Sequence, residues 1–205
     1  MHKKVELISK RNKVYRLIED EGKSILKIFS NKDDMEKELT LLQLLHTNGC
    51  KVPEVLKITS DSLYLEDLGD MTLLNWLEKS ERISSEDILH VITKLADWLT
   101  VFYDTISSRL GLNYIMNDVN FRNFLIKDDE IYGIDFEQSK EGEMVEDFGK
   151  LAAYALTYDP QMTDWKKKFV KLLIDQLSLK FNISTESIES EMEKELVRIN
   201  LRRYK

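Results

Sequence analysis

The stretch that decides the fold is Ile115–Glu137, IMNDVNFRNFLIKDDEIYGIDFE. Its second half contains two short apolar runs around a polar turn, Lys127–Glu130, which is typical of a β-hairpin. Because a hairpin reverses the chain, Asn123 before the first strand and Asp135 after the second would meet at the same end. An amide oxygen and a carboxylate that converge beside the further carboxylate of Asp118 suit a hard cation such as Mg²⁺.

The interval Asp118-x-x-x-x-Asn123 is that of the kinase catalytic loop, in which the Asp receives a hydroxyl and the Asn holds metal. Residues 115–149 resemble the core of the aminoglycoside phosphotransferase and choline kinase group, which are relatives of the protein kinases. That group reads roughly His-Gly-Asp-Leu-His-x-x-Asn, then a hairpin, then Ile-Asp-Phe/Trp-Glu, and then an Asp that opens a helix. Here Asp118, Asn123, Asp135 and Asp147 occupy the matching positions.

The resemblance implies an α+β, protein-kinase-like fold of two lobes, in which Asp118 is the catalytic base and Asn123 and Asp135 hold Mg²⁺. One departure stands out, because Met116 and Asn117 replace the His and Gly that precede the catalytic Asp in the group. The His position braces the loop in that group, so its replacement removes no catalytic side chain.

The composition is that of one compact unit or of two small lobes around a cleft: 205 residues, 42% hydrophobic and 33% charged. A formal net charge of −7 without a long basic stripe argues against nucleic acid as a partner. A single cysteine, Cys50, excludes an intrachain disulfide and a cysteine-based zinc cluster. We find neither a signal peptide nor a run of membrane-spanning length, and therefore expect no membrane association and a cytoplasmic protein.

The N-terminal part is expected to form three strands, because β-branched and aromatic residues alternate there between polar turns: Val5–Ile8, Val14–Ile18 and Ser24–Phe29. In kinase-like folds the first hairpin loop covers the ATP phosphates. The loop here, Ser9–Lys13, contains no glycine, but it runs into Asn-x-Val-Tyr as in the aminoglycoside kinase group. The resemblance therefore places Asn12 at the nucleotide.

Lys27 lies inside the third strand between apolar residues, where a lysine commonly snorkels toward solvent. The resemblance instead makes it the lysine that binds nucleotide phosphates and pairs with a helix glutamate. The following helix is predicted over Lys32–Thr47 with Asn31 as its cap. At about 100° per residue, Glu38 falls within the apolar face of this helix. Because a buried carboxylate needs a cationic partner, Glu38 is the expected partner of Lys27.

Two further strands, Val52–Ile58 and Ser62–Glu66, lead into Glu66-Asp67-Leu68-Gly69 and a helix from Leu73 to Glu78. The resemblance makes this segment the hinge, whose backbone would bind adenine at Glu66 and Leu68. An ordinary strand-to-helix loop explains the same residues.

The chain from Ser84 onward is predicted to be largely helical, with Ser84-x-x-Asp87 as a capping arrangement. The sequence Asp147-Phe148-Gly149 is a literal copy of the protein-kinase metal motif, but no strand precedes it. We interpret Asp147 as an N-terminal helix cap with a structural role, and the matching Asp of the group also steadies the catalytic loop. The last two helices are expected over about Thr163–Phe181 and Ser184–Tyr204.

The expected lobes are residues 1–68, which bind nucleotide, and residues 69–205, which carry the catalytic and substrate groups. The implied activity is Mg²⁺-dependent transfer of the ATP γ-phosphoryl group to a hydroxyl, with an aminoglycoside-, choline- or sugar-like small molecule as the acceptor. Two alternatives remain open, a reduced Ser/Thr protein kinase and a pseudokinase that acts as a scaffold. The sequence leaves the acceptor and the oligomeric state undetermined.

Overall fold

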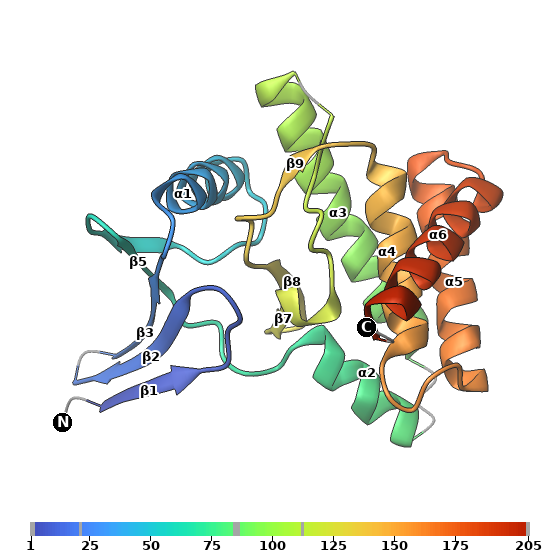
Figure 1. Ribbon diagram of the computed structural model, residues 1–205, viewed down its shortest axis with the longest axis horizontal. Coiled ribbons are helices and arrows are strands. Elements are labelled where there is room, and N and C mark those ends of the chain that lie inside the picture. Colours follow the sequence, from blue (N-terminus) through green and yellow to red (C-terminus); the bar gives the residue numbers. More distant parts are fainter. Residues whose placement is uncertain (1–2, 21, 84–86, 112, 204–205) are drawn as a thin grey trace.

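The computed structural model describes residues 3–20, 22–83, 87–111 and 113–203. Figure 1 shows two parts, a sheet with one helix at the N-terminal end and a group of helices at the C-terminal end. A small hairpin lies between them (Figure 1). This is the α+β, two-lobe, kinase-like architecture that the sequence predicts.

The N-terminal sheet has five antiparallel strands in the order β1-β2-β3-β5-β4. Their bounds are Lys3–Leu7, Lys13–Glu19, Gly22–Ile28, Val55–Ile58 and Ser62–Glu66 for β1 to β5 in chain order. Each predicted strand is present, with ends that differ by at most three residues. Lys27 lies opposite Val14 on one side and Leu63 on the other, so it belongs to a central strand of the sheet.

Helix α1, Lys32–Thr47, has the predicted bounds. Asn31 caps it by accepting a hydrogen bond from the Asp33 N–H at 3.0 Å, which satisfies one of the free amides of the first turn. The buried face of the helix consists of four apolar residues and one charged residue: Met35, Leu41, Leu42, Leu45 and Glu38. Glu38 is thus buried with its apolar neighbours, as its angular position predicts.

The C-terminal lobe is built from α2 to α6, with bounds Leu73–Arg82, Ile88–Leu110, Met144–Thr157, Asp164–Phe181 and Thr185–Arg203. The predicted capping arrangement at Ser84 lies outside the described residues. Thr163 caps α5, which otherwise ends where predicted. Among the described residues, no helix is both long and apolar enough to cross a membrane.

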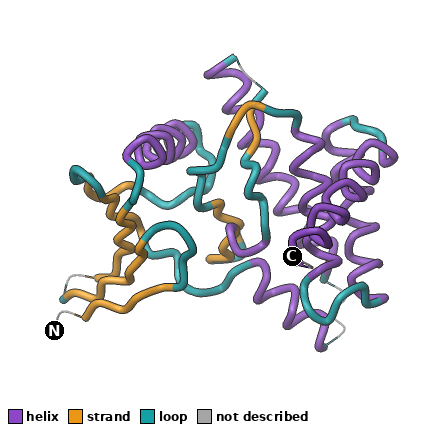
Figure 2. Tube along the Cα trace, in the orientation of Figure 1, coloured by secondary structure: helices purple, strands orange, loops and turns teal. Residues whose placement is uncertain are grey.

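The hairpin between the lobes consists of β7, Phe124–Lys127, and β8, Glu130–Gly133. Its turn is Asp128-Asp129, and both residues have positive φ, 52° and 60°. Positive φ at both central positions is the requirement of a two-residue turn that matches strand twist, and Asp tolerates it. The Ile134 N–H donates to the Asn123 carbonyl at 2.9 Å, which closes the end of the hairpin beside Asp135. In Figure 2 the two strands of the hairpin lie between the N-terminal sheet and the helices of the C-terminal lobe.

Aromatic rings hold this hairpin against α3. Phe136 stacks on Phe102 at a centroid distance of 6.1 Å, and Trp98 stacks on Phe102 at 5.4 Å. Gly133 faces the Trp98 ring so closely that an added Cβ would lie 2.2 Å from it. Because Phe136 directly follows Asp135, this aromatic core fixes the backbone that presents Asp135.

Three shorter elements complete the chain: β6, Tyr114–Ile115, pairs with β9, Lys140–Glu141, and the 3-10 turn η1 covers Phe121–Asn123. Helices α4 and α6 cross closely at Gly149, where an added Cβ would lie 2.4 Å from the Glu191 Cβ and 2.6 Å from its backbone. Glycine is therefore required at this crossing.

The prediction that Asp147 caps its helix is wrong. Helix α4 begins at Met144, and its first turn is closed by Glu143, whose N–H donates to Glu146 Oε1 at 3.1 Å. Asp147 lies inside the helix, fully buried. Glu146 and Asp147 are consecutive acidic residues, and either suits the start of a helix. The sequence alone therefore does not show at which residue the helix begins.

Candidate active site

A buried lysine, Lys27 on β3, lies where the sheet, α1 and the segment after the hairpin meet, and this meeting point is called the cleft below. The Lys27 Nζ lies 2.6 Å from Glu38 Oε2, 2.7 Å from Asp135 Oδ1 and 3.1 Å from Glu137 Oε2. Lys27 therefore pairs with Glu38 and does not snorkel to solvent. The contact with Asp135 crosses from the sheet to the segment after the hairpin, and so it joins the two lobes.

Three carboxylates share this one ammonium group. Burial acts to lower the pKa of Lys27, but Glu38, Asp135 and Glu137 together raise it above its ordinary value. Burial raises the pKa of Glu38, because it disfavours the charged carboxylate. The charge of Lys27 acts to lower this pKa, while the neighbouring carboxylates of Asp135 and Glu137 act to raise it further. Asp135 is the accessible member, with 38% of its side chain exposed against 2% and 3% for the other two. A phosphate or a cation that enters the cleft would meet Asp135 first.

Glu137 is a site residue that sequence reasoning missed. Its Oε2 accepts a hydrogen bond from Asn12 Nδ2, its Oε1 lies 3.7 Å from Arg11, and its carbonyl accepts from Lys37 Nζ at 3.1 Å. It thus ties the glycine-free loop between β1 and β2 to the C-terminal lobe. The one signal in the sequence is a second carboxylate two residues after Asp135.

Asn12, predicted to contact nucleotide, bridges two elements in this structure. Its Oδ1 accepts from the Ser30 N–H at 3.2 Å while its Nδ2 donates to Glu137. Contact between Asn12 and nucleotide stays a prediction.

Asp118 lies in the loop before η1 and has one carboxylate oxygen fixed. Its Oδ1 accepts from Asn120 Nδ2 at 2.7 Å, and its backbone carbonyl accepts from Asn123 Nδ2, also at 2.7 Å. Asn123 is buried. Its amide nitrogen therefore braces the loop, while its amide oxygen stays available to a cation. The hairpin brings Asn123 to the same end as Asp135, as predicted.

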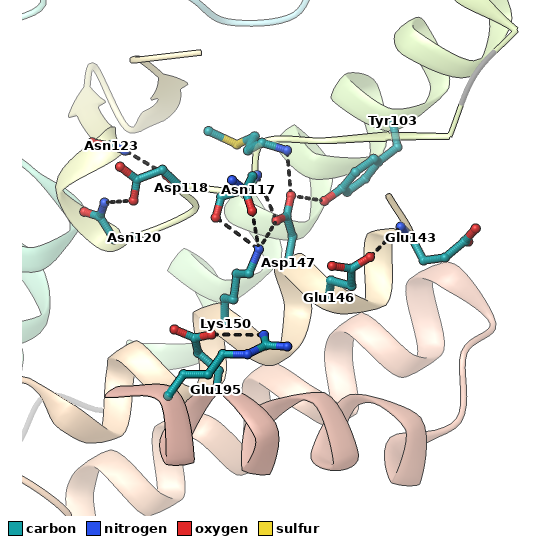
Figure 3. Close-up of polar contacts among 12 residues, drawn as sticks. Tyr103, Asn117, Asp118, Asn120, Asn123, Glu143, Glu146, Asp147, Lys150 and Glu195 are labelled. Atoms are coloured by element: carbon teal, nitrogen blue, oxygen red, sulfur yellow. Dashed lines mark hydrogen bonds and ion pairs between the residues drawn. The ribbon is translucent and has the colours of Figure 1, made fainter. Parts of the chain in front are cut away.

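Asp147 braces the same loop from beneath (Figure 3). Its Oδ2 accepts from the Tyr103 hydroxyl at 2.9 Å and from the Met116 N–H at 2.8 Å, and its Oδ1 accepts from the Asn117 N–H at 3.1 Å. Burial raises its pKa to about 6, although Lys150 and these donors act to lower it. Asp135, and not Asp147, contacts Lys27, so the literal Asp-Phe-Gly lies apart from this lysine, and its Asp holds the backbone of Met116 and Asn117 instead of capping a helix.

The predicted hinge connects β5 to α2. The Glu66 N–H donates to the Glu54 carbonyl, and the Glu66 carboxylate accepts from Lys127 Nζ at 2.7 Å. Within the described part of the chain, the Leu68 N–H has no hydrogen-bond acceptor. Beside it lies an open hollow of about 270 Å³ lined in part by Arg16, Leu68 and Asp70. Most of the residues that line this hollow are charged, and the binding of adenine by the Glu66 and Leu68 backbone stays a prediction.

The donor set also fits a divalent cation. Glu38, Asp135 and Glu137 each offer a carboxylate oxygen, and these oxygens lie within 4.8 Å of one another. Carboxylate oxygens are what Mg²⁺ and Ca²⁺ take in proteins. Asp135 belongs both to this group and to the predicted pair of Asn123 and Asp135. Glu38 and Glu137 belong only to the group, and Asn123 belongs only to the predicted pair.

The comparisons with known proteins bear on the fold and the family. Residues 3–148 match the RIO domain. Among solved structures, the chain is similar to the amicoumacin kinase hAmiN in complex with AMP-PNP, Ca²⁺ and Ami, with 14% identity and a TM-score of 0.56. That alignment covers 86% of this chain and 72% of the other. The comparison with curated proteins finds no match.

The kinase-like family suggested by the sequence is therefore confirmed at the level of the fold, and the membership of the aminoglycoside phosphotransferase and choline kinase group is not. The matched span contains the sheet, α1, the hinge, the catalytic loop and the hairpin. By this match the chain belongs to the RIO domain family, an atypical branch of the protein-kinase-like proteins.

Proposed function

We propose that this protein transfers the γ-phosphoryl group of ATP to a hydroxyl group, with Asp118 as the catalytic base. The observation that carries the proposal is the convergence of Lys27, Glu38 and Asp135, which come from β3, α1 and the end of the hairpin. Phosphoryl transfer needs little covalent chemistry from a protein, so catalysis is mainly positioning and charge stabilisation. The cleft supplies both.

Each residue has a separate task in this proposal. Lys27, held in place by Glu38, fixes the nucleotide phosphates by its ammonium charge. The Leu68 N–H and the Glu66 carbonyl of the hinge bind the adenine edge. Asp118 orients the acceptor hydroxyl and accepts its proton through the carboxylate oxygen that Asn120 does not occupy. Asn123 and Asp135 offer oxygens to Mg²⁺, with Glu137 beside them.

Bound Mg²⁺ would supply positive charge against the phosphate oxygens. The residues around it determine where that charge can lie: Asp135 is exposed to the cleft, and Glu38 and Glu137 are buried behind it. The similar hAmiN structure contains AMP-PNP and Ca²⁺, which supports a nucleotide and a divalent cation in a fold of this kind.

We propose a small hydroxyl compound as the acceptor. The support for it is that the amicoumacin kinase hAmiN, to which this chain is similar in fold, has a structure in complex with Ami as well as AMP-PNP. A protein acceptor is the second candidate, and membership of an atypical protein-kinase-like family favours it.

The deciding experiment measures ATP consumption by the purified full chain against a panel of hydroxyl compounds and protein acceptors, with Mg²⁺ and with EDTA. We expect Mg²⁺-dependent transfer to one class of acceptor and slow ATP hydrolysis without an acceptor. The absence of both, together with retained nucleotide binding, would reject the enzyme and favour the scaffold alternative.

A further inference from the structure

The residue before the catalytic Asp118 has an unfavourable backbone conformation. Asn117 has φ of 65°, and the Asp118 N–H donates to the Met116 carbonyl at 2.8 Å. A hydrogen bond from residue i+2 to residue i around a positive central φ is the pattern of the rarer, strained γ-turn. Such a conformation persists only where neighbouring groups hold it. Asn tolerates positive φ better than most residues, and this chain has Asn at that position.

Two residues one turn apart on α4 hold this γ-turn. Asp147 accepts the Asn117 N–H, as described above. The Lys150 Nζ donates to Asn117 Oδ1 at 2.8 Å and to the Asn117 carbonyl at 3.2 Å, and it lies 3.9 Å from Asp147 Oδ1. Figure 3 shows Lys150 extending from its helix to Asn117. The Asn117 N–H is thus held by the Asp147 carboxylate, and both Asn117 oxygens are held by the Lys150 ammonium.

Lys150 is a buried charge that phosphoryl transfer does not itself require, with 9% of its side chain exposed. A buried ammonium is unfavourable unless hydrogen bonds and an opposite charge compensate for it. Here the compensation comes from the catalytic loop and from Asp147. The burial of Lys150 and the backbone of Asn117 therefore stabilise each other.

We propose that Lys150 is a positioning residue for Asp118: by binding both oxygens of Asn117, it locks the γ-turn that aims the catalytic carboxylate. This assignment rests on the proposed role of Asp118. It gives Asn117 a function that a glycine could not provide, because glycine has no side-chain oxygen for the ammonium. Asn117, which replaces the Gly of the aminoglycoside phosphotransferase and choline kinase group, thus forms a clamp together with Lys150.

The test compares Lys150→Met, which keeps the length of the side chain and removes the ammonium, with Lys166→Met. Lys166 is the matched control, because it is also a buried lysine of the C-terminal lobe, and its ammonium contacts Glu81 and the Pro160 carbonyl, both at 2.6 Å, instead of the loop. Both variants lose a buried ion pair. The first measurement is amide hydrogen exchange at residues 116–119, which requires no turnover.

We expect Lys150→Met to speed exchange at the Asp118 amide by about tenfold or more, and Lys166→Met to leave it unchanged. Equal exchange in the wild type and Lys150→Met would overturn the proposal. This measurement decides the clamp even if the wild type shows no phosphoryl transfer, so the failure of the proposed function would remain a separate result.

The second measurement is Mg²⁺-dependent ATP hydrolysis, with water as the acceptor, at a temperature where all variants are folded. We expect Lys150→Met to lower kcat by about 10- to 100-fold, because a small misplacement of a catalytic group has an effect of this size. KM for ATP should stay unchanged, and Lys150→Arg should recover part of kcat. Asn117→Ala combined with Lys150→Met should be no worse than the more damaging single change. A kcat of Lys150→Met equal to that of Lys166→Met, or fully additive losses, would contradict the assignment.

Discussion

At the scale of single residues, the site divides its charges between two tasks. Lys27, Glu38 and Asp135 form one cluster, to which the proposed function assigns the phosphates. Asp118 stands apart from this cluster, with its own hydrogen bonds to Asn120 and Asn123. No direct contact joins Asp118 to Lys27 among the described interactions. Removing the Asp118 carboxylate should therefore affect turnover and nucleotide binding differently from removing the Asp135 carboxylate.

Asp118→Asn should abolish most turnover, by about 10²–10⁴-fold, and leave Mg·ATP affinity nearly intact. Asp135→Asn should lower affinity and turnover together, because it removes a charge from the cation site. A thermal-shift titration with Mg·ATP beside a phosphoryl-transfer assay measures both effects. Loss of Mg·ATP binding in Asp118→Asn would show that the two carboxylates share one task.

Asp147 makes stability depend on pH. Its pKa is raised to about 6 by burial, so the folded protein holds this proton more tightly than the unfolded chain, whose pKa is about 3.9. Its contribution to stability is therefore present below about pH 4 and is lost as pH rises through about 6. Urea unfolding between pH 4 and pH 7 should show a flatter pH dependence for Asp147→Asn than for the wild type. Identical slopes would mean that Asp147 does not titrate in this range.

At the scale of elements, the hairpin β7–β8 acts as the fixed part that carries both metal-site candidates. Its ends hold Asn123 and Asp135, its turn uses two residues with positive φ, and its back rests on Trp98 and Phe102. The sequence predicts the hairpin well because turn and strand signals are local. It does not show the contact of Gly133 with Trp98, which depends on the packing of α3.

Gly133→Ala should destabilise the protein by about 1–3 kcal/mol, the range for overpacking a well-filled core. The added methyl group would lie 2.2 Å from the Trp98 ring, which cannot retreat easily because its Nε1 donates to the Lys51 carbonyl at 2.7 Å. Urea unfolding measures the change. Trp98→Phe in the Gly133→Ala background should recover part of the loss, since the smaller ring lacks the atoms that clash. A purely additive double mutant would place the strain elsewhere.

At the scale of the whole molecule, the two lobes meet through charge as well as through the hinge. Lys27 contacts Asp135, Asn12 and Arg11 contact Glu137, and Arg16 on β2 contacts Asp70 at 2.6 Å. The cleft is thus lined by carboxylates on the side that the proposal assigns to the triphosphate. Without a divalent cation, these carboxylates and the phosphates would repel each other.

ATP should accordingly bind at least about tenfold more weakly in EDTA than in Mg²⁺, because Lys27 alone cannot offset three carboxylates. Calorimetry of the wild type under both conditions measures this ratio, with Asp135→Asn as the comparison. The variant should bind metal-free ATP no worse than the wild type does. Equal affinities of the wild type in EDTA and in Mg²⁺ would count against a cation site at Asp135.

The sequence predicts most of the fold and the centre of the site, for identifiable reasons. Helix α1 and the pairing of Lys27 with Glu38 follow from angular periodicity and from the unfavourable burial of an unpaired carboxylate. Glu137 and the clamp of Asn117 by Lys150 do not, because these contacts join segments that are distant in sequence and have no local pattern. The helix start predicted at Asp147 is wrong, because an Asp suits both a helix cap and a buried hydrogen-bond acceptor, and the sequence does not distinguish these two roles.

Gly149 has a consequence for how such chains can diversify. It is the first residue after the region that matches the RIO domain, and α6 lies against its bare backbone. Helix α6 can therefore pack in this position only on a core that has glycine at position 149. In a chimera that joins α6 to a core with any larger residue at that position, the side chain would clash with Glu191, and α6 could not pack against α4 as it does here.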